Sequence, residues 1–206
     1  VTFTRTIQIY LESEALVEIG KFDLSCFFRV RFRQLADAHQ SGGLTELGYR
    51  IDWCTNFGES DAPDHCSRET NSLRHEIMHE FLRLDSEYPT RDPKVQAWVA
   101  RRKSAHLAYT GGLDVRFFTC LAFCCFFVDD GGVVCFADQI YGSDGKPIIH
   151  LHVSRKGVTT RIPVKRSRMY FEAAMAIARR RGHDTPLDKQ CQMAGVLIFL
   201  GIGIDL

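Results

Sequence analysis

The chain reads Leu121-Ala-Phe-Cys-Cys-Phe-Phe-Val-Asp-Asp-Gly-Gly-Val-Val-Cys-Phe-Ala-Asp138 just past its middle, and this stretch decides the fold. Two apolar runs flank Asp129-Asp-Gly-Gly132, which is a strong turn signal. A second turn signal, Gly142-Ser-Asp-Gly145, leads into a third apolar run. The stretch therefore predicts three consecutive antiparallel strands, over about 113–128, 131–141 and 147–154.

Helix and strand patterns continue on both sides of these strands. Towards the N-terminus, residues 2–10 alternate like an amphipathic strand, and further strands are expected over 25–32 and 48–57. Helical patterns cover about 70–86, 93–107 and 165–181, and a last apolar strand is expected over 194–204. This order predicts an α+β fold with a mostly antiparallel sheet flanked by about three helices. We expect a single domain, 1–206, with a weak boundary near 108–112 as the alternative.

Composition points to an ordinary intracellular protein. Hydrophobic residues make up 45% of the 206 residues, and the formal net charge is +1. Several of the eight cysteines lie in apolar runs and none forms a CxxC pair, so we interpret them as reduced thiols. The beginning of the sequence lacks a signal-peptide pattern, and the uncharged stretch 193–204 is too short to span a bilayer. These features predict a cytoplasmic protein without membrane association.

Two histidines one residue apart, His150 and His152, lie in the third apolar run. Side chains alternate along a strand, so both imidazoles are expected on one face, where they would begin a divalent-metal site. If residues 142–145 close a hairpin, Asp138 faces His150 and becomes the third ligand. A register slip of one residue would bring Gln139 there instead. Such nitrogen and oxygen ligands suit Mg²⁺ or Mn²⁺.

The segment that follows is strongly basic. Residues 154–181 contain nine lysines and arginines but one acid, Glu172, and such a field attracts polyanions. Tyr170 lies in this segment, and a phenol beside a metal and several cations can attack phosphorus. We therefore expect a nucleic acid, namely DNA, as the partner. RNA and an acidic protein are the alternatives that stay open. The candidate contact residues are Arg155, Lys156, Arg161, Lys165, Arg166 and Arg168.

This arrangement resembles the HUH endonucleases, which include relaxases and the rolling-circle replication initiators of phages and plasmids. In that family a His–hydrophobic–His strand binds a divalent metal, and a tyrosine on a later helix nicks single-stranded DNA. Tyr49-Arg-Ile-Asp52 occupies a place similar to the Arg-x-Asp strand of initiators associated with filamentous phages. The resemblance implies that His150 and His152 bind metal, that Tyr170 is the nucleophile, and that single-stranded DNA of a mobile element is the substrate.

A rival motif, His75-Glu-Ile-Met-His79, matches the HExxH pattern of zinc peptidases. Glu76 would be the general base, and Asp85 falls ten residues after His75, where some relatives of the metzincin type have a third zinc ligand. However, the apolar stripe of the same helix predicts that both histidines face away from the core. The stripe consists of Leu73, Ile77, Phe81 and Leu84.

The sequence thus leaves three functions open. The first is a metal-dependent protein of a mobile element that binds or nicks DNA. The second is a zinc hydrolase that uses His75, Glu76 and His79. The third is a non-enzymatic interaction protein, such as a phage-encoded inhibitor, whose basic segment docks a partner.

Overall fold

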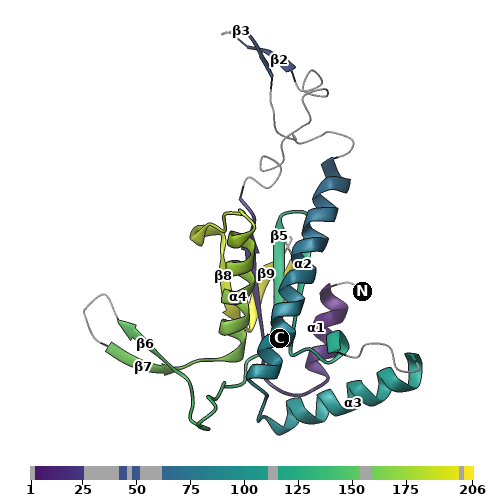
Figure 1. Ribbon diagram of the computed structural model, residues 1–206, viewed down its shortest axis with the longest axis vertical. Coiled ribbons are helices and arrows are strands. Elements are labelled where there is room, and N and C mark those ends of the chain that lie inside the picture. The colour runs from purple at the N-terminus through teal and green to yellow at the C-terminus, as the bar shows by residue number, and fades with distance from the viewer. Residues whose placement is uncertain are drawn as a thin grey trace.

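A four-stranded antiparallel sheet lies at the centre of the protein (Figure 1). The computed structural model describes residues 3–25, 42–45, 48–51, 62–110, 116–153, 159–199 and 202–206. The sheet has the order β4 (Ala122–Phe127), β5 (Asp130–Phe136), β1 (Val17–Asp23) and β8 (Cys191–Ala194). The strand nearest the N-terminus is therefore an inner strand, between the hairpin of β4 and β5 and a strand from near the C-terminus.

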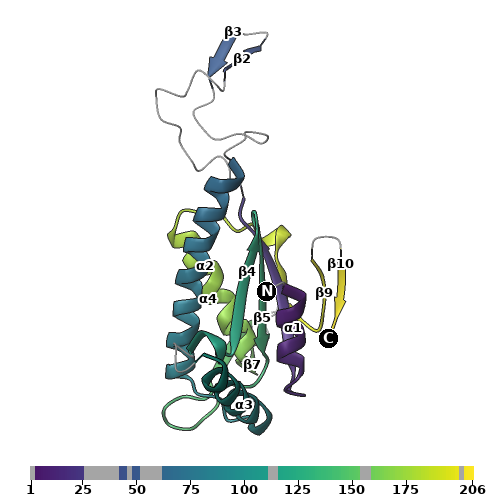
Figure 2. The ribbon, with the colours of Figure 1, turned by 90° about the vertical axis from the view of Figure 1, so that its right-hand side faces the viewer.

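Helices cover both faces of this sheet, as Figure 2 shows. On one face lie α2 (Ala62–Glu87) and α4 (Arg166–Arg180), and on the other lies α1 (Phe3–Leu11). The helix α3 (Pro93–Thr110) crosses one end of the sheet. Two short 3₁₀ helices, η3 (Arg116–Phe118) and η4 (Leu187–Lys189), complete the helical elements of the described ranges. The predicted α+β fold is confirmed, with four α-helices in the part of the chain that the structure describes.

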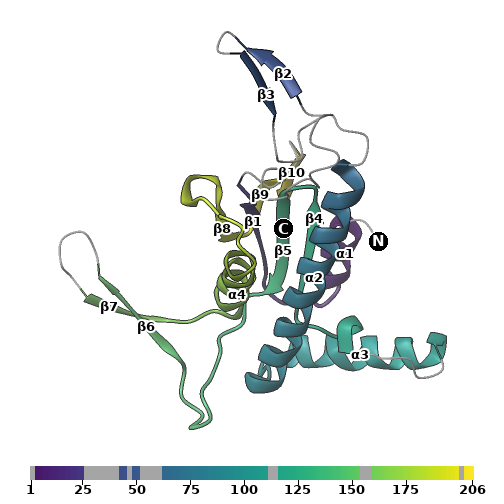
Figure 3. The same cartoon turned by 45° about the horizontal axis from the view of Figure 1, so that its top comes forward.

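Three two-stranded antiparallel pairs surround the central sheet. They are β2 (Gly42–Thr45) with β3 (Gly48–Ile51), β6 (Ile149–Val153) with β7 (Thr159–Pro163), and β9 (Val196–Phe199) with β10 (Ile202–Asp205). The pair of β6 and β7 stands away from the sheet and its helices (Figure 3). Among the described residues, no helix is both long enough and apolar enough to cross a membrane.

Each face of the sheet has its own apolar core. On β5, Val133 and Cys135 belong to the core beneath α2 and α4, whereas Val134 and Phe136 belong to the core shared with α1 and α3. Because both faces are buried, β5 reads as a continuous apolar run rather than as an alternating one. The cysteines in these runs, among them Cys124 and Cys135, are buried free thiols.

The β4–β5 turn differs from its prediction by about two residues. Phe127 pairs with Asp130, so the turn consists of Val128 and Asp129, and Val128 adopts a positive φ of 59°. The first glycine of the predicted turn, Gly131, is instead part of β5. A Cβ atom there would lie 2.5 Å from Cζ of Phe22. This glycine is needed because the Phe22 ring packs directly on the backbone of the neighbouring strand.

Residues 2–10 were predicted as a strand, and this is wrong, because residues 3–10 belong to α1. Ile7 and Tyr10 are buried one helical turn apart, against Trp98 and Phe136. The short run of alternating residues fits both a period of two and a period of 3.6, and packing against the sheet selects the helix. The Tyr10 hydroxyl group donates to the carbonyl oxygen of Cys120 (2.7 Å), which fixes the helix on the core.

The bounds of several other strands also differ from their predicted bounds. The predicted strand 113–128 contains η3 and β4, and the predicted strand 194–204 corresponds to the end of β8 and to β9 and β10. The predicted strand 48–57 begins as β3 at Gly48, whereas residues 52–57 and 26–32 lie outside the described residues. The alternative domain boundary near 108–112 falls at the end of α3 and partly outside them, so the single domain stays a prediction.

Candidate nucleic-acid interface

We call the pair of β6 and β7 the ribbon. Its register pairs His150 with Ile162, Leu151 with Arg161 and His152 with Thr160. Alternating and β-branched residues favour these strands, and Pro163, which lacks a backbone N–H group, ends β7. Both strands pair only with each other in the described part of the chain. The ribbon therefore exposes two faces and two edges.

The exposed surface of the ribbon is mixed in character. Ile149, Leu151 and Ile162 are 43%, 58% and 39% exposed, and His150 and Arg161 are exposed as well. The strands are joined by residues 154–158, which include Arg155 and Lys156 but lie outside the described residues, as does the side chain of His152. An apolar and basic surface without covering elements is typical of a segment that contacts a partner.

Neither Asp138 nor Gln139 completes the predicted metal site on this strand. The turn at 142–145 does close a hairpin with the expected register, since Tyr141 pairs with Pro147. Beyond this bridge the chain changes partner, because Gln139 pairs with Lys165 and His150 pairs with Ile162. The expectation that Asp138 or Gln139 faces His150 is therefore wrong. The part of the chain that the structure describes contains no group of three or more potential side-chain ligands arranged around a metal position.

Asp138 instead binds a buried arginine. The Arg166 guanidinium, 0% exposed, donates from Nε to Asp138 Oδ1 (2.6 Å) and from Nη2 to Oδ2 (3.1 Å). It also donates to the Tyr88 carbonyl oxygen (2.8 Å), and Thr90 donates to Asp138 (2.8 Å). Burial alone would lower the pKa of Arg166, but its bonds to Asp138 raise it, so the guanidinium stays protonated. The prediction that Arg166 contacts nucleic acid is wrong, because this side chain is enclosed.

Tyr170 lies in the same buried network. Its side chain is 0% exposed and its ring packs on that of Phe81, with centroids 5.0 Å apart. Its hydroxyl group donates to Asp85 and accepts a hydrogen bond from Nη1 of Arg166 (3.4 Å). Burial and the nearby Asp85 carboxylate both raise the pKa of Tyr170. A phenol in this position is held neutral and out of reach of a polynucleotide.

Asp85 is bound to residues other than His75 and His79. It accepts hydrogen bonds from the Tyr170 hydroxyl group and from the backbone N–H of Leu121 (3.0 Å), so it joins α2 to the start of β4. Burial raises the pKa of this carboxyl group, and its hydrogen bonds oppose the rise. Asp85 lines the same pocket as His79, but the described residues hold no group of three potential metal ligands. Both histidines are exposed, as the apolar stripe predicts.

Glu76, the predicted base of the peptidase motif, is occupied as well. Arg181 donates from Nε to its Oε2 atom (2.8 Å), and Arg180 lies 3.8 Å from its other oxygen. These ion pairs join α2 to the end of α4. The Glu76 carboxylate is therefore engaged by two guanidinium groups.

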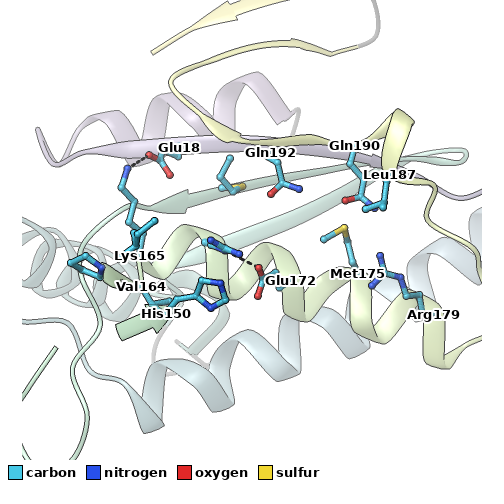
Figure 4. Close-up of a pocket in the computed structure, with 14 residues that line it drawn as sticks. Glu18, His150, Val164, Lys165, Glu172, Met175, Arg179, Leu187, Gln190 and Gln192 are labelled. Atoms are coloured by element: carbon cyan, nitrogen blue, oxygen red, sulfur yellow. Dashed lines mark hydrogen bonds and ion pairs between the residues drawn. The ribbon is translucent and has the colours of Figure 1, made fainter. Parts of the chain in front are cut away.

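A groove of about 780 Å³ runs between the ribbon, α4 and the edge strand β8 (Figure 4). His150 lines it from β6, Arg168 and Arg179 line it from α4, and Gln190 and Gln192 line it from the opposite side. Its cations are partly neutralised, since Arg168 donates to Glu172 (2.8 Å) and Lys165 donates to Glu18 (2.5 Å). The groove is therefore lined by apolar side chains and by charged side chains of both signs.

Glu18, which no motif in the sequence singled out, positions one side of the groove. Its carboxylate accepts hydrogen bonds from Lys165 and from the Ser167 hydroxyl group (2.6 Å), and so holds the first turn of α4 against β1. Residues 17–23 do begin with the alternation typical of a strand, Val-Glu-Ile-Gly. That pattern was the available signal for β1.

No known family model matches the chain, and no curated protein is significantly similar to it in sequence. Its function therefore has to be inferred from the geometry of the described residues.

Proposed function

We propose that the protein binds DNA and that the ribbon is its principal contact element. The observation that carries this proposal is the projection of β6 and β7 away from the rest of the fold (Figure 1). Neighbouring strands lie about 5 Å apart, and the major groove of B-DNA is about 12 Å wide, so a two-stranded ribbon fits into it. Proteins that read DNA with strands use this geometry.

The charges of the ribbon support the same proposal. Arg161 is exposed on β7, and the residues that join β6 to β7 add Arg155 and Lys156 to the local sequence. Of the six other bases of the segment 154–181, five are paired with carboxylates, namely Lys165, Arg166, Arg168, Arg180 and Arg181. The sixth, Arg179 on α4, donates to the Thr185 hydroxyl group. Most of the basic charge around α4 is thus already paired, which favours the ribbon as the element that neutralises phosphates.

The proposal concerns binding and does not extend to strand cleavage. A tyrosine nucleophile must reach a phosphate, whereas the hydroxyl group of Tyr170 is bound to Asp85 inside the core. A zinc peptidase activity is not proposed either, since Glu76 and Asp85 are both bound to other residues.

The test is a titration by fluorescence anisotropy with a duplex DNA, one of its single strands, and a duplex RNA of the same sequence. We expect the duplex DNA to bind most tightly, with an affinity that falls steeply as salt is raised. Arg161→Ala should weaken binding and reduce the slope of log K against log salt by about 1, as expected for one lost phosphate contact.

Arg168→Ala is the matched control, because it removes an exposed arginine of the same basic segment that is paired with Glu172. Its effect on affinity should be clearly smaller than that of Arg161→Ala. Equal effects of the two variants, or no binding to any of the three nucleic acids at low salt, would contradict the proposal. Tighter binding to single-stranded DNA would overturn the assignment of the ribbon to the major groove.

A further inference from the structure

His75 and His79 form a close pair on the exposed face of α2. Their Nε2 atoms lie 3.2 Å apart, and their ring centroids are separated by 4.3 Å. The residues are one helical turn apart, so the backbone alone brings them to the same face. The two Nε2 atoms, rather than other parts of the rings, are thus the atoms that approach each other.

We propose that this pair chelates one divalent transition-metal ion, with water at the remaining coordination positions. Two imidazole nitrogens bound to a tetrahedral metal at 2.0–2.1 Å lie about 3.3 Å apart, which matches the observed separation. Imidazole ligands suit Zn²⁺, Cu²⁺ and Ni²⁺, so an ion of this class is the expected ligand. Without metal, the same geometry allows one ring to donate a hydrogen bond to the other.

Phe117 on η3 restrains the two rings. Its ring centroid lies 5.1 Å from that of His79 in an edge-on arrangement, and 6.3 Å from that of His75. A chelating pair gains affinity when its side chains are held in the binding geometry before the metal arrives. The aromatic contact supplies such a restraint from outside the helix.

The proposed site has no hydrolytic partner. Glu76 is bound by Arg181, and Asp85 is bound by Tyr170 and the backbone of Leu121. The inference is therefore a metal-binding site with two protein ligands, which bridges one turn of α2 and stabilises that helix. It is independent of the proposed DNA contact, which is made by another part of the chain.

Isothermal titration of the untagged full chain with NiCl₂ tests this site. We expect one Ni²⁺ ion to bind per chain, and the thermal unfolding midpoint to rise in the presence of Ni²⁺. His79→Ala should abolish both effects, and His75→Gln should do the same. Phe117→Ala should keep both ligands but weaken binding by about tenfold, which is the scale of a lost supporting contact.

His150→Ala is the matched control, because it removes an exposed histidine of the other histidine pair in the sequence. It should leave Ni²⁺ binding and the thermal shift unchanged. Loss of binding in His150→Ala, retention of binding in His79→Ala, or absence of binding to the unmodified chain would each overturn the proposal. Circular dichroism of each variant before titration establishes that α2 is intact.

Discussion

Arg166 and Arg161 come from the same basic segment, yet the fold uses them in opposite ways. Arg166 is enclosed, with its guanidinium shared between Asp138, Tyr170 and the Tyr88 carbonyl group. Arg161 is exposed on the ribbon, whose two strands pair with no other strand in the part of the chain that the structure describes. A run of bases in a sequence therefore need not form one surface. Its charges divide here between a buried ion pair and an exposed strand.

The sharpest test of this division is to remove each arginine in turn. Arg166→Met should lower the free energy of unfolding by about 3–5 kcal/mol, because it leaves the Asp138 carboxylate buried without its counter-charge. Arg161→Met should leave stability unchanged and should weaken DNA binding instead. Urea denaturation followed by circular dichroism measures the first effect. Similar stabilities for the two variants would show that the two arginines are not used differently.

A smaller loss is expected at the tyrosine of the enclosed network. Tyr170→Phe keeps the ring but removes the donor to Asp85, so stability should fall by about 1.5–3 kcal/mol, as for a hydrogen bond to a charged group. Tyr10→Phe is the control, because the Tyr10 hydroxyl group donates to a neutral carbonyl oxygen and should contribute about 0.5–1.5 kcal/mol.

Tyr170→Phe also separates binding from chemistry. DNA binding by this variant should equal that of the unmodified chain, since the Tyr170 side chain is buried in the apolar core. If instead the unmodified chain forms a covalent adduct with single-stranded DNA and the variant does not, Tyr170 is a nucleophile and the enclosed network must open.

The smallest expected effect is a pH dependence at Asp85. Burial raises the pKa of this carboxyl group in the folded state, so the neutral form favours folding. Its contribution is fully present below the pKa of an ordinary aspartate and is lost as the pH rises through the raised value. In this window the free energy of unfolding should fall by at most about 1.4 kcal/mol per pH unit.

Asp85→Asn removes this titration, and its single amide oxygen can still accept the hydrogen bond from the backbone N–H of Leu121, while its amide nitrogen faces the Tyr170 hydroxyl oxygen. The difference in stability between the variant and the unmodified chain should therefore change with pH across this window. Urea midpoints at a series of pH values measure it. A constant difference would show that Asp85 titrates alike in the folded and unfolded chains.

The sequence was informative where local pattern and burial agree. The turn signals near Asp129 and Gly142 marked the right hairpins, and the apolar stripe of α2 placed His75 and His79 on the exposed face. It was misleading at α1, where nine residues are too few to distinguish a helical period from a strand period. It also left β1 unrecognised, because Gly20 and Lys21 interrupt the alternation and both faces of the strand are buried.

The strand pairing and the burial that shape the candidate site cannot be predicted from any short stretch of sequence. Whether β6 pairs back to Asp138 or forward to Arg161 is decided by strand pairing beyond the turn, and both options satisfy the local pattern. The burial of Arg166 depends on Asp138, Thr90 and Tyr88, which belong to other parts of the chain. Two different motifs singled out Tyr170 and Asp85 for two different functions. Neither motif showed that the two residues bind each other in one buried network with Arg166.

The position of β1 has a consequence for how the molecule acquires its structure. During synthesis this strand emerges before α2, α3 and β4, whereas its two neighbours, β5 and β8, come after them. Both of its hydrogen-bonding edges stay open in the meantime, and sheets built from such distant segments form slowly. The newly made chain therefore passes through a stage in which an apolar strand must be kept from pairing with other molecules.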